Sequence, residues 1–214
     1  MQRLVSPEQL DHLPHTDPAA IRSRLELRGI NALMGNHRWL VRELQRSAPL
    51  QGPVLELGAG DGRLLEKALR ARAIEAHQWM ALDLAPAPHD WPPVATWHQT
   101  DLLRLQTLPE AEVVVANLFL HHFEPPALAR IGSQWPSSCR LILANEPTRA
   151  PLHRMQGRCL SWLVNLSAVT RHDMECSIEA GFQGNELPDW LGLHGWQVRI
   201  TRTLLGAYRM RAWR

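Results

Sequence analysis

The sequence predicts an α/β domain built on a mainly parallel, doubly wound sheet, and three observations predict this class. Short apolar runs with the length of buried strands occur at residues 53–57, 79–84, 94–98, 112–117 and 140–145. Segments with helical spacing of apolar residues separate several of these runs, as in βαβ units. Two final runs, at 196–203 and 206–213, lie too close together for a crossover and predict an antiparallel hairpin.

The helices are expected to begin at the N-terminus, where residues 1 to about 50 are predicted to be largely helical. Asp17 followed by Pro18 is typical of an N-cap and first helical position, and it opens a helix to residue 34. A second helix is expected to continue to Pro49. Three more are expected at residues 61–72, 125–135 and 174–180, the last with Asp173 as its N-cap and Gly181 as its C-cap.

Length and composition fit one domain with a sizeable core. The chain has 214 residues, of which 45% are hydrophobic and 21% charged, with a formal net charge of +2. No apolar run is long enough to predict a membrane span, and we expect neither a leader segment nor a nucleic-acid partner. Three widely spaced cysteines, without a CxxC pair, favour reduced thiols, no bound metal and a cytoplasmic location.

The most informative stretch is the glycine-rich loop that follows the first expected strand. It reads Glu56-Leu-Gly58-Ala59-Gly60-Asp-Gly62 and leads into a helix. Glycines allow a backbone to approach a ligand closely, and the helix N-terminus presents free N–H groups. Nicotinamide-binding loops follow GxGxxG, whereas this loop is GxGxG after an acid. The carboxylate of Glu56 would repel a pyrophosphate and suits a ligand with an ammonium group.

Two further acids follow the next two expected strands. Asp83 ends residues 79–84 at the place where an acid binds the ribose hydroxyls in doubly wound nucleotide folds. Asp101 follows the third strand and could accept a hydrogen bond from an adenine amino group. The alternative for Asp101 is an N-cap of a short helical turn. Together with the glycine loop, these acids predict a nucleoside-binding crevice at the carboxyl edge of the sheet.

These segments resemble class I S-adenosylmethionine-dependent methyltransferases of the ubiquinone/menaquinone-biosynthesis-like group. The stretches VLELGAGDG, ALDL, QTDLL, VVVANLFLHHF and LILANEP are similar to five successive motifs of that family. The resemblance implies a Rossmann-like, seven-stranded sheet of order 3-2-1-4-5-7-6 with an antiparallel last strand. It also implies S-adenosylmethionine as cofactor. The binding residues that it implies are Glu56, Gly58, Ala59, Gly60, Asp83, Leu84, Asp101, Leu102, Asn117 and Leu118.

The same resemblance divides the single domain by role. Residues 1–50 are expected to form a helical cap and residues 51–147 the cofactor-binding core. Residues 148–195 are the variable segment expected on the acceptor side, and residues 196–214 close the sheet with the hairpin.

The acceptor side is predicted at the exit of the fourth strand, where His121 and His122 follow one another. Histidine suits removal of a proton at neutral pH, because its ordinary pKa lies close to that pH. Glu146 ends the adjacent strand, and related small-molecule methyltransferases place an acid there beside the first histidine. We expect His121 to be the base and Glu146 to orient it, with His122 as the second candidate. The alternative is that both histidines only pack within the loop.

The predicted function is methyl transfer from S-adenosylmethionine to a small, partly apolar acceptor such as a phenol, quinol or polyketide-like molecule. O-methylation is favoured over C-methylation, because the histidines offer a base. Two alternatives stay open. One is an NAD-dependent oxidoreductase, which the loop spacing and Glu56 disfavour. The other is a non-catalytic S-adenosylmethionine-binding protein. The sequence leaves the oligomeric state open.

Overall fold

The computed structural model describes residues 1–14 and 16–214 and contains one seven-stranded sheet. The strand order is β3-β2-β1-β4-β5-β7-β6; β7 runs antiparallel to both of its neighbours, and the other adjacent pairs are parallel. This confirms the predicted fold class, including the final hairpin. The strands are β1 Val54–Leu57, β2 Trp79–Asp83, β3 Thr96–Gln99, β4 Val113–Asn117, β5 Leu141–Pro147, β6 Gln197–Arg202 and β7 Ala207–Trp213.

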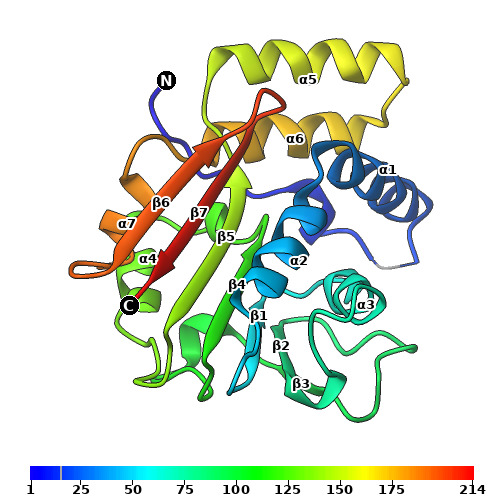
Figure 1. The fold of residues 1–214 in the computed structure, drawn as a ribbon. Coiled ribbons are helices and arrows are strands. Elements are labelled where there is room, and N and C mark those ends of the chain that lie inside the picture. The colour runs from blue at the N-terminus through cyan, green and yellow to red at the C-terminus, as the bar shows by residue number, and fades with distance from the viewer. Residues whose placement is uncertain (15) are drawn as a thin grey trace.

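Helices lie on both faces of the sheet and beyond its upper edge (Figure 1). The α-helices are α1 Pro18–Met34, α2 Asn36–Ser47, α3 Arg63–Arg70, α4 Pro125–Gly132, α5 Pro151–Leu163, α6 Ala168–Ala180 and α7 Glu186–Trp190. Four single turns complete the set: η1 Gln9–Asp11, η2 Ala76–Gln78, η3 Leu102–Arg104 and η4 Leu120–His122. None of the described helices is long and apolar enough to cross a membrane.

The core is double because the central strands are apolar on both faces. In β4, Val113 and Val115 belong to the cluster formed with α2 and α3. Val114 and Ala116 alternate with them and belong to the cluster formed with α4 and α7. A strand buried on both faces reads as a continuous apolar run, which is why this strand was easy to predict.

The strand ends gather the functional residues at one edge. The parallel strands β1, β2, β4 and β5 all end toward the side where α1, α5 and α6 lie in Figure 1. Crossover connections place every loop that follows a parallel strand at this edge, where ligands bind in open α/β sheets. Residues from these loops are therefore neighbours in space.

Two local expectations were wrong. Residues 1–17 are not largely helical: apart from η1, the described residues of this stretch have no helical structure, and they run as a segment across α6. Asp17 does cap α1, accepting a hydrogen bond from Ala19 N at 2.7 Å. Asp173 is not an N-cap, because α6 begins earlier and Ser167 caps it. The buried Asp173 carboxylate instead accepts hydrogen bonds from Gln9 N and Leu10 N.

Candidate functional site

The glycine loop between β1 and α3 has a backbone that only glycine adopts without strain. Gly58, Gly60 and Gly62 have φ values of 66°, 56° and 70°. A Cβ at Gly58 would lie 2.1 Å from the ring of Phe119, so that glycine lets an aromatic side chain rest on the loop. A Cβ at Gly60 would meet nothing within 4 Å. The loop is therefore packed at Gly58 and open at Gly60.

Asp83, at the end of β2, ties two loops together. Its Oδ2 accepts a hydrogen bond from Gly60 N at 2.8 Å, and its Oδ1 accepts one from Ala85 N at 2.8 Å. The next residue, Leu84, leaves 71% of its surface exposed. An acid and an exposed apolar side chain thus border the open part of the glycine loop. A ribose would hydrogen-bond to such an acid, and a flat base would pack on such an apolar side chain.

Glu56 lies beneath the loop rather than in the open. It is 3% exposed, and its Oε2 accepts a hydrogen bond from the indole Nε1 of Trp79 at 3.1 Å. Burial, with Asp61 and Asp83 nearby, raises the pKa of Glu56 to about 8. Trp79 could not be predicted as its partner, because the pairing depends on the register between β1 and β2.

Asp101 and Leu102 begin the turn η3 after β3. The Oδ1 of Asp101 accepts a hydrogen bond from Leu103 N at 2.9 Å, so this acid does cap a turn. Its side chain stays partly exposed and lies 3.5 Å from Arg104 Nε, while Leu102 is buried. The capping role and a contact to a ligand are compatible, because the second carboxylate oxygen remains near the surface.

The exit of β4 is strained and polar. Leu118 has a φ of 53°, uncommon for a residue other than glycine, and it is held by a hydrogen bond from its N–H to Asn145 O at 2.8 Å. Asn117 accepts a hydrogen bond from Asn145 Nδ2 at 3.0 Å, and its Nδ2 lies 3.4 Å from His37 Nε2. This backbone turns the following residues back over the glycine loop.

Glu146 organises the turn that carries the two histidines. It is fully buried, and its Oε1 accepts hydrogen bonds from Phe119 N and Leu120 N at 3.1 and 2.9 Å. Its Oε2 accepts a longer one from His121 N and lies 2.8 Å from His121 Nδ1. The structure thus brings His121 and Glu146 together, and the same carboxylate fixes both the backbone and the ring.

His121 is 2% exposed and lies between two carboxylates. Its Nε2 lies 3.5 Å from Oε1 of Glu8, a residue of the N-terminal segment. Burial alone would favour a neutral ring, but Glu146 and Glu8 outweigh it and raise the pKa of His121 to about 9. Burial and the neighbouring His121 lower the pKa of His122 to about 4. His121 is therefore the more basic ring.

Glu8 is the site residue that sequence reasoning missed. No pattern near residue 8 points to it, and only the fold brings it to His121. Atoms of Glu8, His121 and His122 that could ligate a metal ion all lie within 4.8 Å of one another. No sequence signal could have found it, because the contact depends on where the N-terminal segment docks.

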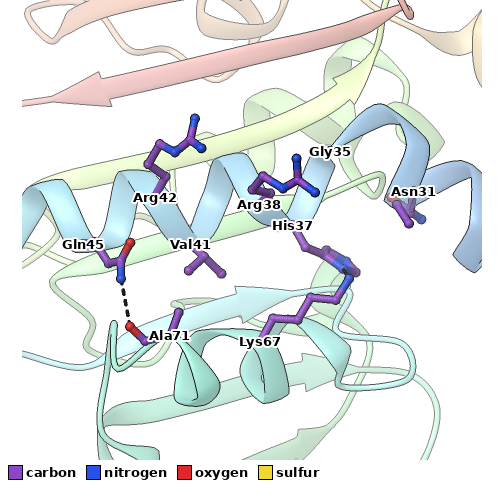
Figure 2. Close-up of a pocket in the computed structure, with 10 residues that line it drawn as sticks. Asn31, Gly35, His37, Arg38, Val41, Arg42, Gln45, Lys67 and Ala71 are labelled. Atoms are coloured by element: carbon purple, nitrogen blue, oxygen red, sulfur yellow. Dashed lines mark hydrogen bonds between the residues drawn. The ribbon is translucent and has the colours of Figure 1, made fainter.

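The helix α1 also reaches the glycine loop. Arg28 of α1 donates a hydrogen bond to Asp61 Oδ2 at 2.9 Å, and Asp61 lies in the loop. Between α2 and α3 lies a groove of about 400 Å³, where His37 and Lys67 point toward one another (Figure 2). His37 Nδ1 is 3.0 Å from Lys67 Nζ, and burial together with this cation lowers the pKa of His37 to about 4. A neutral His37 thus links the groove to Asn117.

Phe119 joins the two halves of the site. It follows the strained Leu118, rests on Gly58, and begins the turn that Glu146 holds. The glycine loop and the histidines are consequently contiguous, although they follow different strands. This arrangement can hold a nucleoside at the open part of the glycine loop and remove a proton at the nearby histidine–carboxylate pair.

Comparison with solved structures shows where this fold occurs. The plantazolicin methyltransferase BpumL, solved with a triazolic desmethylPZN analog and SAH, matches with a TM-score of 0.65 at 11% identity, covering 93% of this chain and 92% of that one. The pyocyanin biosynthetic protein PhzM matches at 0.58 and 18% identity, and human N-acetylserotonin methyltransferase in complex with SAM at 0.56 and 16%. This chain spans 62% of each of the last two, with 97% of its own length covered.

No protein-family model and no curated protein matches the chain. The structural likenesses show that it has the Rossmann-like fold of S-adenosylmethionine-dependent methyltransferases.

Proposed function

We propose that the protein transfers a methyl group from S-adenosylmethionine to a hydroxyl of a small, partly apolar molecule such as a phenol or quinol. One observation carries the proposal. The buried His121–Glu146 pair lies in the same turn as Phe119, and Phe119 rests on the glycine loop. The motif resemblance to the ubiquinone/menaquinone-biosynthesis-like group supports it. So do solved neighbours whose names describe methyltransferases for plantazolicin and N-acetylserotonin.

On the cofactor side, the residues of this chain fit an S-adenosyl group. Asp83 and Leu84 would hold the ribose and adenine, and Gly60 leaves room where a side chain would fill the cradle. Asp101 and Leu102 would contact the adenine, and Glu56, Ala59, Asn117 and Leu118 would complete the binding set. When bound, S-adenosylmethionine supplies an electrophilic methyl group, and the electron pair of the broken carbon–sulfur bond stays on sulfur.

On the acceptor side, His121 would remove the hydroxyl proton. Glu146 accepts from Nδ1–H, which leaves the lone pair of Nε2 to take the proton as the acceptor oxygen bonds to the methyl carbon. The buried carboxylate then stabilises the imidazolium. His122, with its lowered pKa, is the weaker base of the two. We propose residues 1–50 as the cap over this site, residues 148–195 as its acceptor wall and the cytoplasm as its location.

The direct test is a methyl-transfer screen with S-adenosylmethionine and a panel of phenols, quinols and polyketide-like enols, read by mass spectrometry. We expect a mass increase of one methyl group on at least one hydroxyl acceptor. A protein that binds S-adenosylhomocysteine yet methylates no member of the panel would favour the non-catalytic alternative. Reduction of NAD by any of these alcohols would favour the oxidoreductase alternative.

His121→Ala tests the base. Removing a positioned general base typically lowers the rate by about 10²–10⁴. We expect that loss in turnover with little change in S-adenosylhomocysteine affinity, because the polar partners of the ring are Glu146 and Glu8 and not groups of the glycine loop. His77→Ala, at an exposed position of η2 before β2, is the matched control and should keep wild-type turnover. Near-normal turnover of His121→Ala would leave both histidines as packing residues.

The pH dependence follows from the raised pKa of His121. A base must be unprotonated to act, so kcat/KM should rise with pH and level off above about 9. If the rate instead follows the pKa of each acceptor when acceptors of different acidity are compared, catalysis works by alignment of a pre-ionised acceptor, and His121 is not the base.

A further inference from the structure

The N-terminal segment that carries Glu8 is firmly docked on both sides of that residue. Arg3 donates hydrogen bonds from Nε to Ala180 O at 2.8 Å and from Nη2 to Phe123 O at 2.9 Å. Its guanidinium also lies 5.0 Å from the centre of the Phe182 ring. Beyond Glu8, the amides of residues 9 and 10 bind Asp173. Glu8 is therefore held in place by its neighbours in the chain.

The carboxylate of Glu8 is itself mostly enclosed. Its side chain is 12% exposed, one oxygen accepts a hydrogen bond from Ser177 Oγ, and that oxygen faces His121 Nε2. A carboxylate taken out of water is costly unless it is paired and hydrogen-bonded. Ser177 and His121 supply the hydrogen bond and the charge, and although burial opposes it, they lower the pKa of Glu8.

Groups on each element that packs against His121 decide the charge of its ring. Glu146 of β5 and Glu8 of the N-terminal segment lie against its two nitrogens, and Asp11 of η1 adds more distant negative charge. Asp173 of α6 acts on the neighbouring ring of His122. The neighbouring ring of His122 is the opposing group on η4. Arg3 is the nearby cation, and it binds His121 through the backbone oxygen. The carboxylates dominate, so the site favours a proton on the ring.

A metal ion is the other possible occupant of the space between Glu8, His121 and His122. Imidazoles that ligate one ion direct their ring planes to a common point about 2.0–2.1 Å from each nitrogen. The rings of His121 and His122 are tilted by 32°, with their centres 4.3 Å apart. Glu8 Oε1, which would have to ligate such an ion, already accepts a hydrogen bond from Ser177 Oγ and faces His121 Nε2 at 3.5 Å. These contacts favour a proton over an ion between Glu8 and His121.

We infer that Glu8 is a positioning residue for the proton transfer. The docked N-terminal segment brings its carboxylate to the nitrogen of His121 that Glu146 does not contact. The inference rests on the proposed function, because it concerns the base of that reaction. Glu146 fixes the ring from Nδ1, and Glu8 faces Nε2, the nitrogen that would take the acceptor's proton. In the free enzyme Glu8 holds the ring in register and stabilises its protonated form. When the acceptor binds, its hydroxyl replaces Glu8 as the partner of Nε2.

The first test needs no turnover. The titration of His121 is followed by NMR on the full chain, with the signal assigned by its loss in His121→Asn. The variants are Glu8→Gln, which keeps the size and the acceptor for Ser177, and Glu8→Asp. We expect the midpoint to fall by about 1–3 pH units in Glu8→Gln and by less in Glu8→Asp. Glu124→Gln, which removes the exposed partner of Arg3, should leave it unchanged. An unchanged midpoint in a folded Glu8→Gln protein would overturn the inference.

The second test is kinetic and compares how kcat/KM of Glu8→Gln changes at low pH and at high pH. In Glu8→Gln the acid limb of kcat/KM should move to lower pH, because the ring loses its proton more easily. The plateau at high pH should fall roughly 3–10-fold, because a less basic ring is a weaker base. A purely structural role predicts a uniform loss at all pH values and would contradict the inference. So would stoichiometric divalent metal in the purified protein that Glu8→Gln lacks and whose removal abolishes turnover.

The two proposals fail separately. If no acceptor is methylated at any pH, the proposed function fails, while the NMR titration still decides whether Glu8 controls His121. If wild-type protein methylates an acceptor and Glu8→Gln keeps both the wild-type pH profile and the wild-type titration, only the inference about Glu8 fails.

Discussion

Asp83 illustrates how one side chain serves the fold and the ligand together. Its two oxygens already accept backbone hydrogen bonds from Gly60 and Ala85, and further lone pairs remain for ribose hydroxyls. Each charge-assisted hydrogen bond contributes roughly 1.5–3 kcal/mol. Asp83→Ala should thus weaken S-adenosylhomocysteine binding at least tenfold by calorimetry. Asp90→Ala, an exposed acid further along the same connection, should bind normally. Unchanged affinity in a folded Asp83→Ala protein would remove this acid from the site.

The glycine loop allows two matched substitutions with different outcomes. Gly58→Ala meets the Phe119 ring and a left-handed backbone, so we expect a loss of about 2–4 kcal/mol in the free energy of unfolding. Gly60→Ala meets only the backbone strain, about 1–2 kcal/mol. Urea unfolding measures both changes. If the open space at Gly60 holds the cofactor, Gly60→Ala should also lose most of its S-adenosylhomocysteine affinity. Retained affinity would place the ligand elsewhere.

At the scale of single elements, the N-terminal segment shows what pattern reading misses. Asp173 stands seven residues before the end of α6 and resembles an N-cap in the sequence. It lies inside the helix instead, because α6 begins earlier, with Ser167 as its cap. Its carboxylate serves a different segment of the chain. The helix α1, by contrast, begins with a capping acid and a proline and ends at Gly35, so its bounds follow from local chemistry.

Asp173→Ala should release this segment. The substitution leaves Gln9 N and Leu10 N without their acceptor, so amide exchange of residues 3–11 should rise well above wild type. Asp17→Ala is the control, since it removes only the cap of α1 and should speed exchange near residues 18–20. Equal protection of residues 3–11 in wild type and Asp173→Ala would mean that the other contacts of the segment, those of Arg3 and Glu8 among them, suffice to dock it.

At the scale of the whole molecule, the sheet was predictable and much of the site was not. Strands such as β4 are apolar on both faces, and loops after parallel strands meet at one edge, so the sequence suffices to group Asp83, Asp101 and His121. The partner of Glu56 depends on strand register, and Glu8 reaches His121 only through the docking of a segment without regular structure. Contacts of that kind carry no local pattern.

The most direct measurement of the central claim is thermal unfolding with S-adenosylhomocysteine, with NAD as the comparison ligand. A ligand at one hundred times its Kd stabilises the folded state by about 2.7 kcal/mol. For a chain of 214 residues this corresponds to a rise in Tm of roughly 5–10 °C. We expect that rise with S-adenosylhomocysteine, none with NAD, and a much smaller rise in Asp83→Ala. Stabilisation by NAD and not by S-adenosylhomocysteine would contradict the account.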